Sequence, residues 1–148
     1  MPWEYRSGMN RRALLLLATL CSLPVHAEAQ TPLPSLSVRE AHEAAKAGKL
    51  VLVDIRTPEE WADTGVPEGA IRLDMTGSAF EVRLAALKLD HPGKPIALIC
   101  RTGNRTSTLQ RTFAARGWKE LVDVRGGLLG NPRDKGWLAE GLPVTSYP

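Results

Sequence analysis

The sequence predicts an α/β fold, in which a mainly parallel central sheet of about five strands carries helices on both faces. Short apolar runs of strand length alternate with longer segments whose apolar residues recur every three or four positions. This alternation is typical of parallel sheets, because each crossover between parallel strands is long enough to hold a helix. The runs are continuously apolar, which indicates strands buried on both faces.

The first helix and the first core strand have clear boundaries in the sequence. Ser37 and Glu40 form a capping-box pattern, which opens a helix that we expect to end near Gly48. The apolar run over residues 50–55 then predicts a buried strand, with Asp54 near its end. Ligands of parallel sheets bind beyond the carboxyl ends of the strands, so Asp54 lies where a site is expected.

The remaining elements continue the alternation. Residues 70–73 predict a shorter strand, and the spacing of apolar residues over 80–89 predicts a helix. The apolar run 96–99 predicts another strand, 105–116 a helix, and 121–124 the next strand. No repeat and no second domain is evident, which favours one domain with a single core.

A polar, glycine-containing loop follows the strand over 96–99 and leads into a helix. It consists of Cys100, Arg101, Thr102, Gly103, Asn104, Arg105 and Thr106. Unpaired N–H groups and the helix dipole favour an anion at such a position, and the two arginines add to this effect. We therefore expect a thiolate at Cys100 at neutral pH. The alternative is an ordinary core cysteine, which the arginines and the glycine disfavour.

The segment from Cys100 to Thr106 resembles the active-site loop of the rhodanese, or single-domain sulfurtransferase, family. Residues 51–61, 65–71 and 122–128, with Trp137 downstream, resemble further motifs of that family in the same order. The second of these departs from the family pattern, because Gly65 stands at the usual histidine position and Glu68 is an additional residue. The resemblance extends over about residues 36–145.

The resemblance implies a rhodanese-like domain and a sulfur-transfer reaction. Cys100 would be the nucleophile, carrying sulfur as a persulfide, and Arg101 to Thr106 would form the loop that binds the substrate. The implied partners are a small-molecule sulfur donor such as thiosulfate and an acceptor that is cyanide, a thiol or a thiol-bearing protein. No cofactor and no metal is implied.

Two other functions stay open at this stage. A non-catalytic rhodanese-like binding module or persulfide carrier would use the same fold, although such a module would have no need to keep Cys100 in an arginine-lined loop. A phosphatase or arsenate reductase is the weaker alternative, because four residues separate Cys100 from Arg105 and the tyrosine-phosphatase signature has a longer loop. A phosphate-binding loop of the Walker type also lacks its Gly-Lys-Ser or Gly-Lys-Thr sequence.

Asp54 and Arg56 are candidate supporting residues. A buried aspartate at a strand end commonly caps a neighbouring loop, and the arginine commonly pairs with a carboxylate such as that of Glu60. We expect this structural role rather than direct contact with substrate.

The N-terminal segment has the pattern of a secretory signal peptide over residues 1–29. Basic residues Arg6, Arg11 and Arg12 precede an apolar stretch over 13–25, and small residues follow at 27–29. The stretch is short for a membrane span, so cleavage is favoured over an uncleaved anchor, and no stable membrane insertion is expected afterwards. We expect an exported, periplasmic protein with an extended leader over 30–35 and the domain over 36–148.

Charge and cysteine content narrow the possible partners further. The formal charge of +3 is spread along the chain without a run of lysines and arginines, so nucleic-acid binding has little support. The chain has two cysteines, Cys21 and Cys100. Cleavage would leave Cys100 as the lone thiol of an exported protein, which indicates reactivity rather than a structural disulfide.

Overall fold

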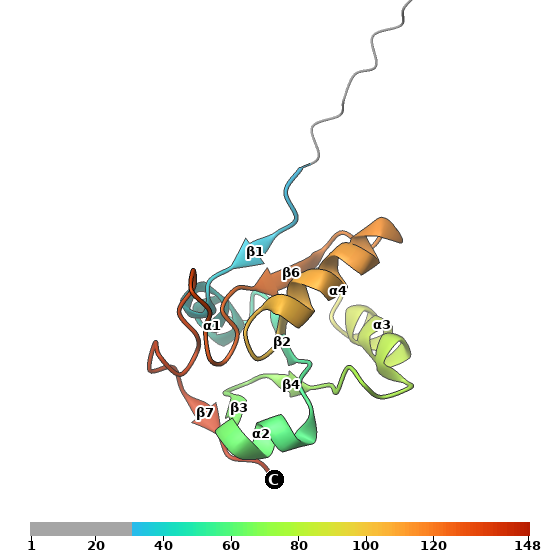
Figure 1. The fold of residues 1–148 in the computed structure, drawn as a ribbon. Helices are drawn as coiled ribbons and strands as arrows, with labels where there is room; N and C mark the ends of the chain where they lie inside the picture. Colours follow the sequence, from blue (N-terminus) through green and yellow to red (C-terminus); the bar gives the residue numbers. More distant parts are fainter. Residues whose placement is uncertain (1–30) are drawn as a thin grey trace, which may run out of the picture. The chain divides into compact units, whose positions relative to one another are not determined.

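The computed structural model describes residues 31–148 and confirms the predicted α/β class. The elements in chain order are β1 (Ser35–Leu36), α1 (Val38–Lys46), β2 (Val51–Asp54), α2 (Pro58–Thr64), β3 (Val66–Pro67), β4 (Ile71–Arg72), α3 (Phe80–Asp90), β5 (Ile96–Ile99), α4 (Asn104–Ala115), β6 (Leu121–Val124) and β7 (Val144–Thr145). Figure 1 shows their arrangement.

The central sheet has five parallel strands in the order β1-β6-β5-β2-β4. Strands β2, β5 and β6 form its middle and are buried along their whole length. In register, Asp54 lies beside Ile99, and Leu98 lies beside Asp123. The segments that follow these strands therefore emerge together at one edge of the sheet (Figure 1).

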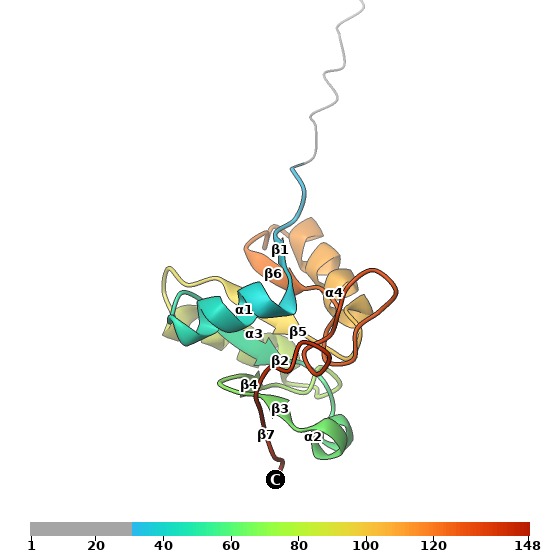
Figure 2. The same ribbon diagram turned by 90° about the vertical axis from the view of Figure 1, so that its left-hand side faces the viewer.

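Two apolar clusters cover the two faces of the sheet. One joins α1, through Val38 and Ala41, to one face and includes the fully buried Trp137. The other joins α3 and α4, through Leu84 and Phe113, to the opposite face and includes Cys100. Figure 2 shows α1 in front of the sheet and α3 behind it. The predicted coverage of both faces is confirmed.

The predicted core elements agree with the observed ones to within one or two residues. Strands β5 and β6 have the predicted bounds, and the predicted capping box at Ser37 is formed, with Glu40 accepting from the Ser37 N–H at 2.7 Å. The apolar pattern did not reveal the two-residue strands β1, β3 and β7. Strands β3 and β7 form a separate antiparallel pair.

The predicted extended leader over 30–35 pairs with the sheet at the leader's C-terminal end. Ser35 belongs to β1, which pairs with β6, and the Pro34 carbonyl accepts from the backbone N–H of Asp123 at 3.1 Å and from Nε2 of Gln110 at 2.6 Å. The predicted signal peptide over 1–29 lies outside the described residues. Within 31–148, no helix is both long and apolar enough to cross a membrane.

Candidate active site

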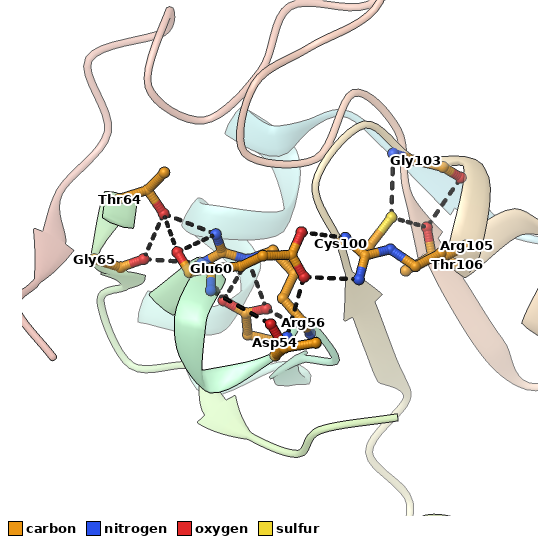
Figure 3. Close-up of polar contacts among 10 residues, drawn as sticks. Asp54, Arg56, Glu60, Thr64, Gly65, Cys100, Gly103, Arg105 and Thr106 are labelled. Atoms are coloured by element: carbon orange, nitrogen blue, oxygen red, sulfur yellow. Dashed lines mark hydrogen bonds and ion pairs between the residues drawn. The ribbon is translucent and has the colours of Figure 1, made fainter. Parts of the chain in front are cut away.

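Cys100 follows β5 directly and lies at the N-terminus of α4. Its Sγ accepts a hydrogen bond from the Gly103 N–H at 3.2 Å and lies 3.5 Å from the Thr106 hydroxyl oxygen. Gly103 is the N-cap of α4 and has φ +95°, a conformation that glycine adopts without strain. The sulfur is thus placed where the helix dipole and an N–H group stabilise negative charge (Figure 3).

A glycine turn holds one side of the Cys100 loop through backbone contacts. The carbonyl groups of Cys100, Arg101 and Thr102 accept from the Leu128 N–H at 2.9 Å, the Leu129 N–H at 2.8 Å and Nδ2 of Asn131 at 2.9 Å, respectively. Three consecutive carbonyl dipoles are thereby engaged by that segment. Because these carbonyl oxygens accept hydrogen bonds from the turn, their partial negative charge repels a thiolate or an anionic donor less.

Gly127 allows this close approach. A Cβ at that position would lie 2.4 Å from the Cys100 carbonyl oxygen and 2.7 Å from the Arg101 carbonyl carbon, and its φ is +57°. No side chain fits between the turn and the loop. Gly127 is therefore a packing requirement of the Cys100 loop.

An ion pair between Glu60 and Arg105 holds the other side of the loop. The Glu60 carboxylate from α2 accepts from both terminal nitrogens of Arg105, at 2.8 and 2.5 Å (Figure 3). The hydrogen bond from Arg105 holds the pKa of Glu60 below its usual range, and the same bond raises the pKa of Arg105. Both side chains stay partly exposed, 33% for Arg105 and 24% for Glu60.

Asp54 and Arg56 form a second pair, which is fully buried. Arg56 Nε donates to both Asp54 oxygens at 3.0 and 3.1 Å, and Nη2 donates to Asp54 at 2.7 Å and to the Gly65 carbonyl at 2.8 Å. Nη1 donates to the Thr64 hydroxyl at 2.7 Å and to the Glu60 carbonyl at 3.2 Å. Every guanidinium donor is used, so Arg56 fastens α2 to the end of β2 and has none left for a substrate.

Sequence reasoning named Glu60 as a possible partner of Arg56. The structure pairs the Glu60 carboxylate with Arg105 and the Asp54 carboxylate with Arg56, and only the backbone carbonyl of Glu60 reaches Arg56. Thr57 and Glu60 also form a capping box at the start of α2. The capping box fixes the backbone around Glu60 and so aims its carboxylate at Arg105.

The remaining loop residues differ in exposure. Arg101 and Asn104 are exposed, Thr102 is half-buried, and Thr106 is fully buried. Arg101 lines a cavity of about 370 Å³ together with Arg56, Glu59, Glu60, Asp63 and Thr64. Among residues 31–148, Arg101 forms no ion pair, and it is therefore the loop cation available to an incoming anion.

Two residues that the sequence analysis did not single out complete the site: Gly127 and Asn131. The adjacent glycines at 126–127 are a signal that the sequence contains. Asn131 has no such signal, because an asparagine beside proline is ordinary in a turn. In the described part of the chain, no three His, Cys, Asp or Glu side chains are grouped so as to hold a metal ion.

Comparison with known proteins identifies the class to which this fold and site belong. The model of the rhodanese-like domain family matches residues 37–130. The chain belongs to the rhodanese-like domain family.

Individual relatives agree with this assignment at modest identity. The uncharacterized protein RP600 of Rickettsia prowazekii is 32% identical over 98 residues, which cover 62% of this chain and 80% of that protein. A sulfurtransferase of Allochromatium vinosum is 28% identical over 97 residues, covering 66% of this chain and 79% of that protein. The solution structure of the polysulfide-sulfur transferase homodimer of Wolinella succinogenes superposes with a TM-score of 0.58 at 27% identity, covering 77% of this chain and 79% of that one.

Proposed function

We propose that this chain is an exported sulfurtransferase that moves sulfane sulfur from a donor such as thiosulfate, through a persulfide on Cys100, to cyanide or a thiol. The observation that carries the proposal is the position of Sγ at the N-terminus of α4, within hydrogen-bond distance of the Gly103 N–H. A thiolate is the reactive form of cysteine, and this environment stabilises it. Membership in a family with sulfurtransferase relatives supports the same reaction.

In the first half-reaction, the Cys100 thiolate attacks the outer sulfur of thiosulfate. A bond forms between Sγ and that sulfur, the sulfur–sulfur bond of thiosulfate breaks, and its electron pair leaves with sulfite. The product is a Cys100 persulfide whose negative charge lies on the outer sulfur. Gly103 N–H and the N-terminus of α4 stabilise the charge on Sγ before the attack.

In the second half-reaction, cyanide or a thiolate attacks the outer sulfur of the persulfide. The new bond forms to the acceptor, and the electron pair of the breaking bond returns to Sγ, which restores the Cys100 thiolate. Sγ is then both the attacking and the leaving group. A site that stabilises its negative charge therefore favours both half-reactions.

The two loop arginines have different roles in this scheme. Arg101 is exposed and without an ion pair in the described region, so it is the first contact for the anionic donor. Arg105 is held by Glu60, and a bound anion reaches its guanidinium only by sharing or displacing that carboxylate. Cys100 is only 1% exposed, so a side chain beside it has to move for the donor to approach.

Cys100→Ser tests the proposal directly. Serine is close to cysteine in size but cannot carry sulfane sulfur, so thiosulfate-dependent transfer should fall below about 1% of wild type. Intact mass after incubation with thiosulfate should show one added sulfur atom in wild type and none in Cys100→Ser. The matched control is Cys21→Ser, made like the other proteins of this test in the uncleaved full-length chain, which removes the other cysteine and should leave both results unchanged. Transfer that persists in a folded Cys100→Ser protein would contradict the proposal.

Export is tested separately, by N-terminal sequencing of the protein from a secreting host. Cleavage after Ala29 gives a mature chain that begins at Gln30. Full-length protein that keeps Met1 on the membrane would contradict cleavage and would leave the proposed reaction unaffected.

A further inference from the structure

The β7 segment, residues 143–147, packs against the part of the chain that departs from the family pattern. Strand β7 pairs antiparallel with β3, and Val66 lies in register with Thr145. The Glu68 N–H donates to the Pro143 carbonyl at 3.0 Å, which continues the same register. Figures 1 and 2 both show β7 beside β3 and α2. Glu68, the additional residue of this chain, therefore takes part in the contact with the β7 segment.

Gly65, the second departure from the family pattern, leaves the space that β7 fills. A Cβ at Gly65 would lie 3.0 Å from the Thr145 carbonyl oxygen and 3.2 Å from Cβ of Val144. These distances are shorter than ordinary van der Waals contact, so β7 would have to move. Gly65 is also the C-cap of α2, and its N–H donates to the Trp61 carbonyl at 2.8 Å. The β7 segment therefore packs on the C-terminal end of α2.

Tyr147 makes a second contact with α2. Its ring packs edge-on against the ring of Trp61, with the centroids 5.4 Å apart, and the Arg72 guanidinium lies 5.0 Å from the centroid of the Tyr147 ring. Trp61 is buried, and its Nε1 has no hydrogen-bond partner within residues 31–148. Packing rather than hydrogen bonding therefore sets the position of the Trp61 side chain, and Tyr147 supplies part of that packing.

Trp61 is the neighbour of Glu60 in α2, a helix of seven residues. In so short a helix, a displacement of Trp61 also displaces Glu60. The Glu60 carboxylate is bonded to Arg105 in the Cys100 loop. It repels an incoming anion and neutralises the guanidinium that would attract one. The contacts that hold α2 in place therefore limit the access of anions to Cys100.

Arg56 attaches α2 to the sheet independently of the β7 segment. Its guanidinium donates to the Glu60 carbonyl at 3.2 Å, to the Thr64 hydroxyl at 2.7 Å and to the Gly65 carbonyl at 2.8 Å. These bonds remain when the contact with Tyr147 is lost. Loss of that contact should therefore loosen the helix without releasing it, so we expect changes of a few fold in reactivity and a folded protein.

We propose that the β7 segment holds α2 so that Glu60 stays on Arg105, and that Tyr147 is a positioning residue for the anionic donor. With Tyr147 packed on Trp61, the ion pair stays closed and anions reach the sulfur slowly. Without that contact, α2 gains freedom, the ion pair opens more often, and Arg105 becomes available to an anion. The proposal rests on the proposed function, because the anion that it concerns is the sulfur donor.

The first measurement compares alkylation of Cys100 by iodoacetate, an anion, with alkylation by iodoacetamide, its neutral analogue, in the full chain. Alkylation is read on the Cys100 peptide, so that Cys21 does not contribute. Tyr147→Ala should raise the ratio of the iodoacetate rate to the iodoacetamide rate about threefold, a change that corresponds to one partly exposed ion pair. A general loosening of the fold raises both rates equally and leaves this ratio unchanged.

Two variants of the same segment are the controls for Tyr147→Ala. Tyr147→Phe keeps the ring that contacts Trp61 and Arg72, so it should give the wild-type ratio. Ser146→Ala changes the exposed neighbouring residue and should also give the wild-type ratio. A threefold rise in either control would show that the ring contact is not the cause.

Further variants test the route through Glu60 and replace Tyr147→Ala should that protein misfold. In a Glu60→Gln background, Tyr147→Ala should change the ratio by less than about 1.5-fold, because no carboxylate is left to release Arg105. Gly65→Ala disturbs the contact with β7 from the α2 side and should raise the ratio. Gly69→Ala is its matched control, with the same φ of +79° and no heavy atom within 4 Å, and it should leave the ratio unchanged.

Turnover gives a second readout. In Tyr147→Ala, the KM for thiosulfate should fall by a similar factor, with kcat within about twofold of wild type. An unchanged alkylation ratio in folded Tyr147→Ala, or an undiminished rise in the Glu60→Gln background, would refute the proposal. Equal ratios in Gly65→Ala and Gly69→Ala would refute the role of the β7 contact. Alkylation needs no sulfur donor, so a wild type that takes up no sulfur from thiosulfate would count against the proposed function alone.

Discussion

The two sides of the Cys100 loop are held by different kinds of interaction. On the α2 side, ion pairs hold the structure, with Glu60 on Arg105 and Asp54 on Arg56. On the opposite side, the turn over 126–131 binds three loop carbonyls, two of them through backbone N–H groups. A charged partner can be exchanged for another charge, whereas a backbone contact of this kind cannot be replaced. The α2 side is therefore suited to respond to an anion, and the turn is suited to keep the loop fixed.

The α2 side itself contains two unlike arginines. Arg56 is buried with all its donors used, and Arg105 is one-third exposed with two bonds to one carboxylate. A buried guanidinium with complete bonding serves the fold, since any loss leaves a buried charge unpaired. A partly exposed one has water and ligands within reach and contributes little to stability.

The largest effect is expected at Gly127. Gly127→Ala places a methyl group 2.4 Å from the Cys100 carbonyl oxygen, and relieving that overlap requires moving the turn or the loop. We expect a loss of about 3 kcal/mol or more in the free energy of unfolding, measured by urea denaturation. Gly141→Ala is the matched control, with a similar φ of +65° and no heavy atom within 4 Å, and it should cost only about 1 kcal/mol. Equal losses in the two variants would show that the close contact is unimportant.

The next largest effect is the difference in stability loss between variants of Arg56 and Arg105. Arg56→Gln leaves the buried Asp54 carboxylate without its partner, so we expect a loss of about 3 kcal/mol in the free energy of unfolding. Arg105→Gln breaks a partly exposed pair and should cost about 1 kcal/mol or less. Urea denaturation of both variants at pH 7 measures the difference. An Arg56→Gln protein with the same free energy of unfolding as wild type would contradict the structural role of Arg56.

A third difference concerns anion binding on the α2 side. Glu60→Gln keeps an acceptor for the Thr57 N–H and removes the carboxylate charge that pairs with Arg105. The KM for thiosulfate should therefore fall about threefold or more, a change that corresponds to the free energy of one surface ion pair. Arg105→Ala should raise that KM. Glu59→Gln is the matched control, because Glu59 lines the same cavity without contacting Arg105. A fall in KM equal to that of Glu59→Gln would show a general charge effect.

The smallest effect is the acid dependence of the Glu60–Arg105 pair. Arg105 lowers the pKa of Glu60 from its ordinary value of 4.5, so the stabilisation is complete above that value and is lost as pH falls through the lowered pKa. Glu60→Gln should therefore be less stable than wild type by about 1 kcal/mol or less at pH 7 and equal to it in strong acid. Thermal unfolding measured across pH 2–7 checks this convergence.

Sequence reasoning succeeded where the signal is local. The continuous apolar runs gave β5 and β6 their bounds, and Ser37 with Glu40 marked the start of α1. The loop from Cys100 to Thr106 was placed at a helix N-terminus because a strand signal precedes it and a helical spacing follows it. The strands β1, β3 and β7 were missed because two residues are too few to show a period.

By itself, the sequence determined the α/β class, the order of the core elements and the delivery of Cys100 to the start of a helix. These follow from burial patterns and capping residues a few positions apart. Only the tertiary structure decided that Glu60 pairs with Arg105 across 45 positions and that Asn131 holds the Thr102 carbonyl across 29. In the sequence alone, several carboxylates are equally possible partners for each arginine. The packing of α2, α4 and the glycine turn around the sheet selects one partner for each.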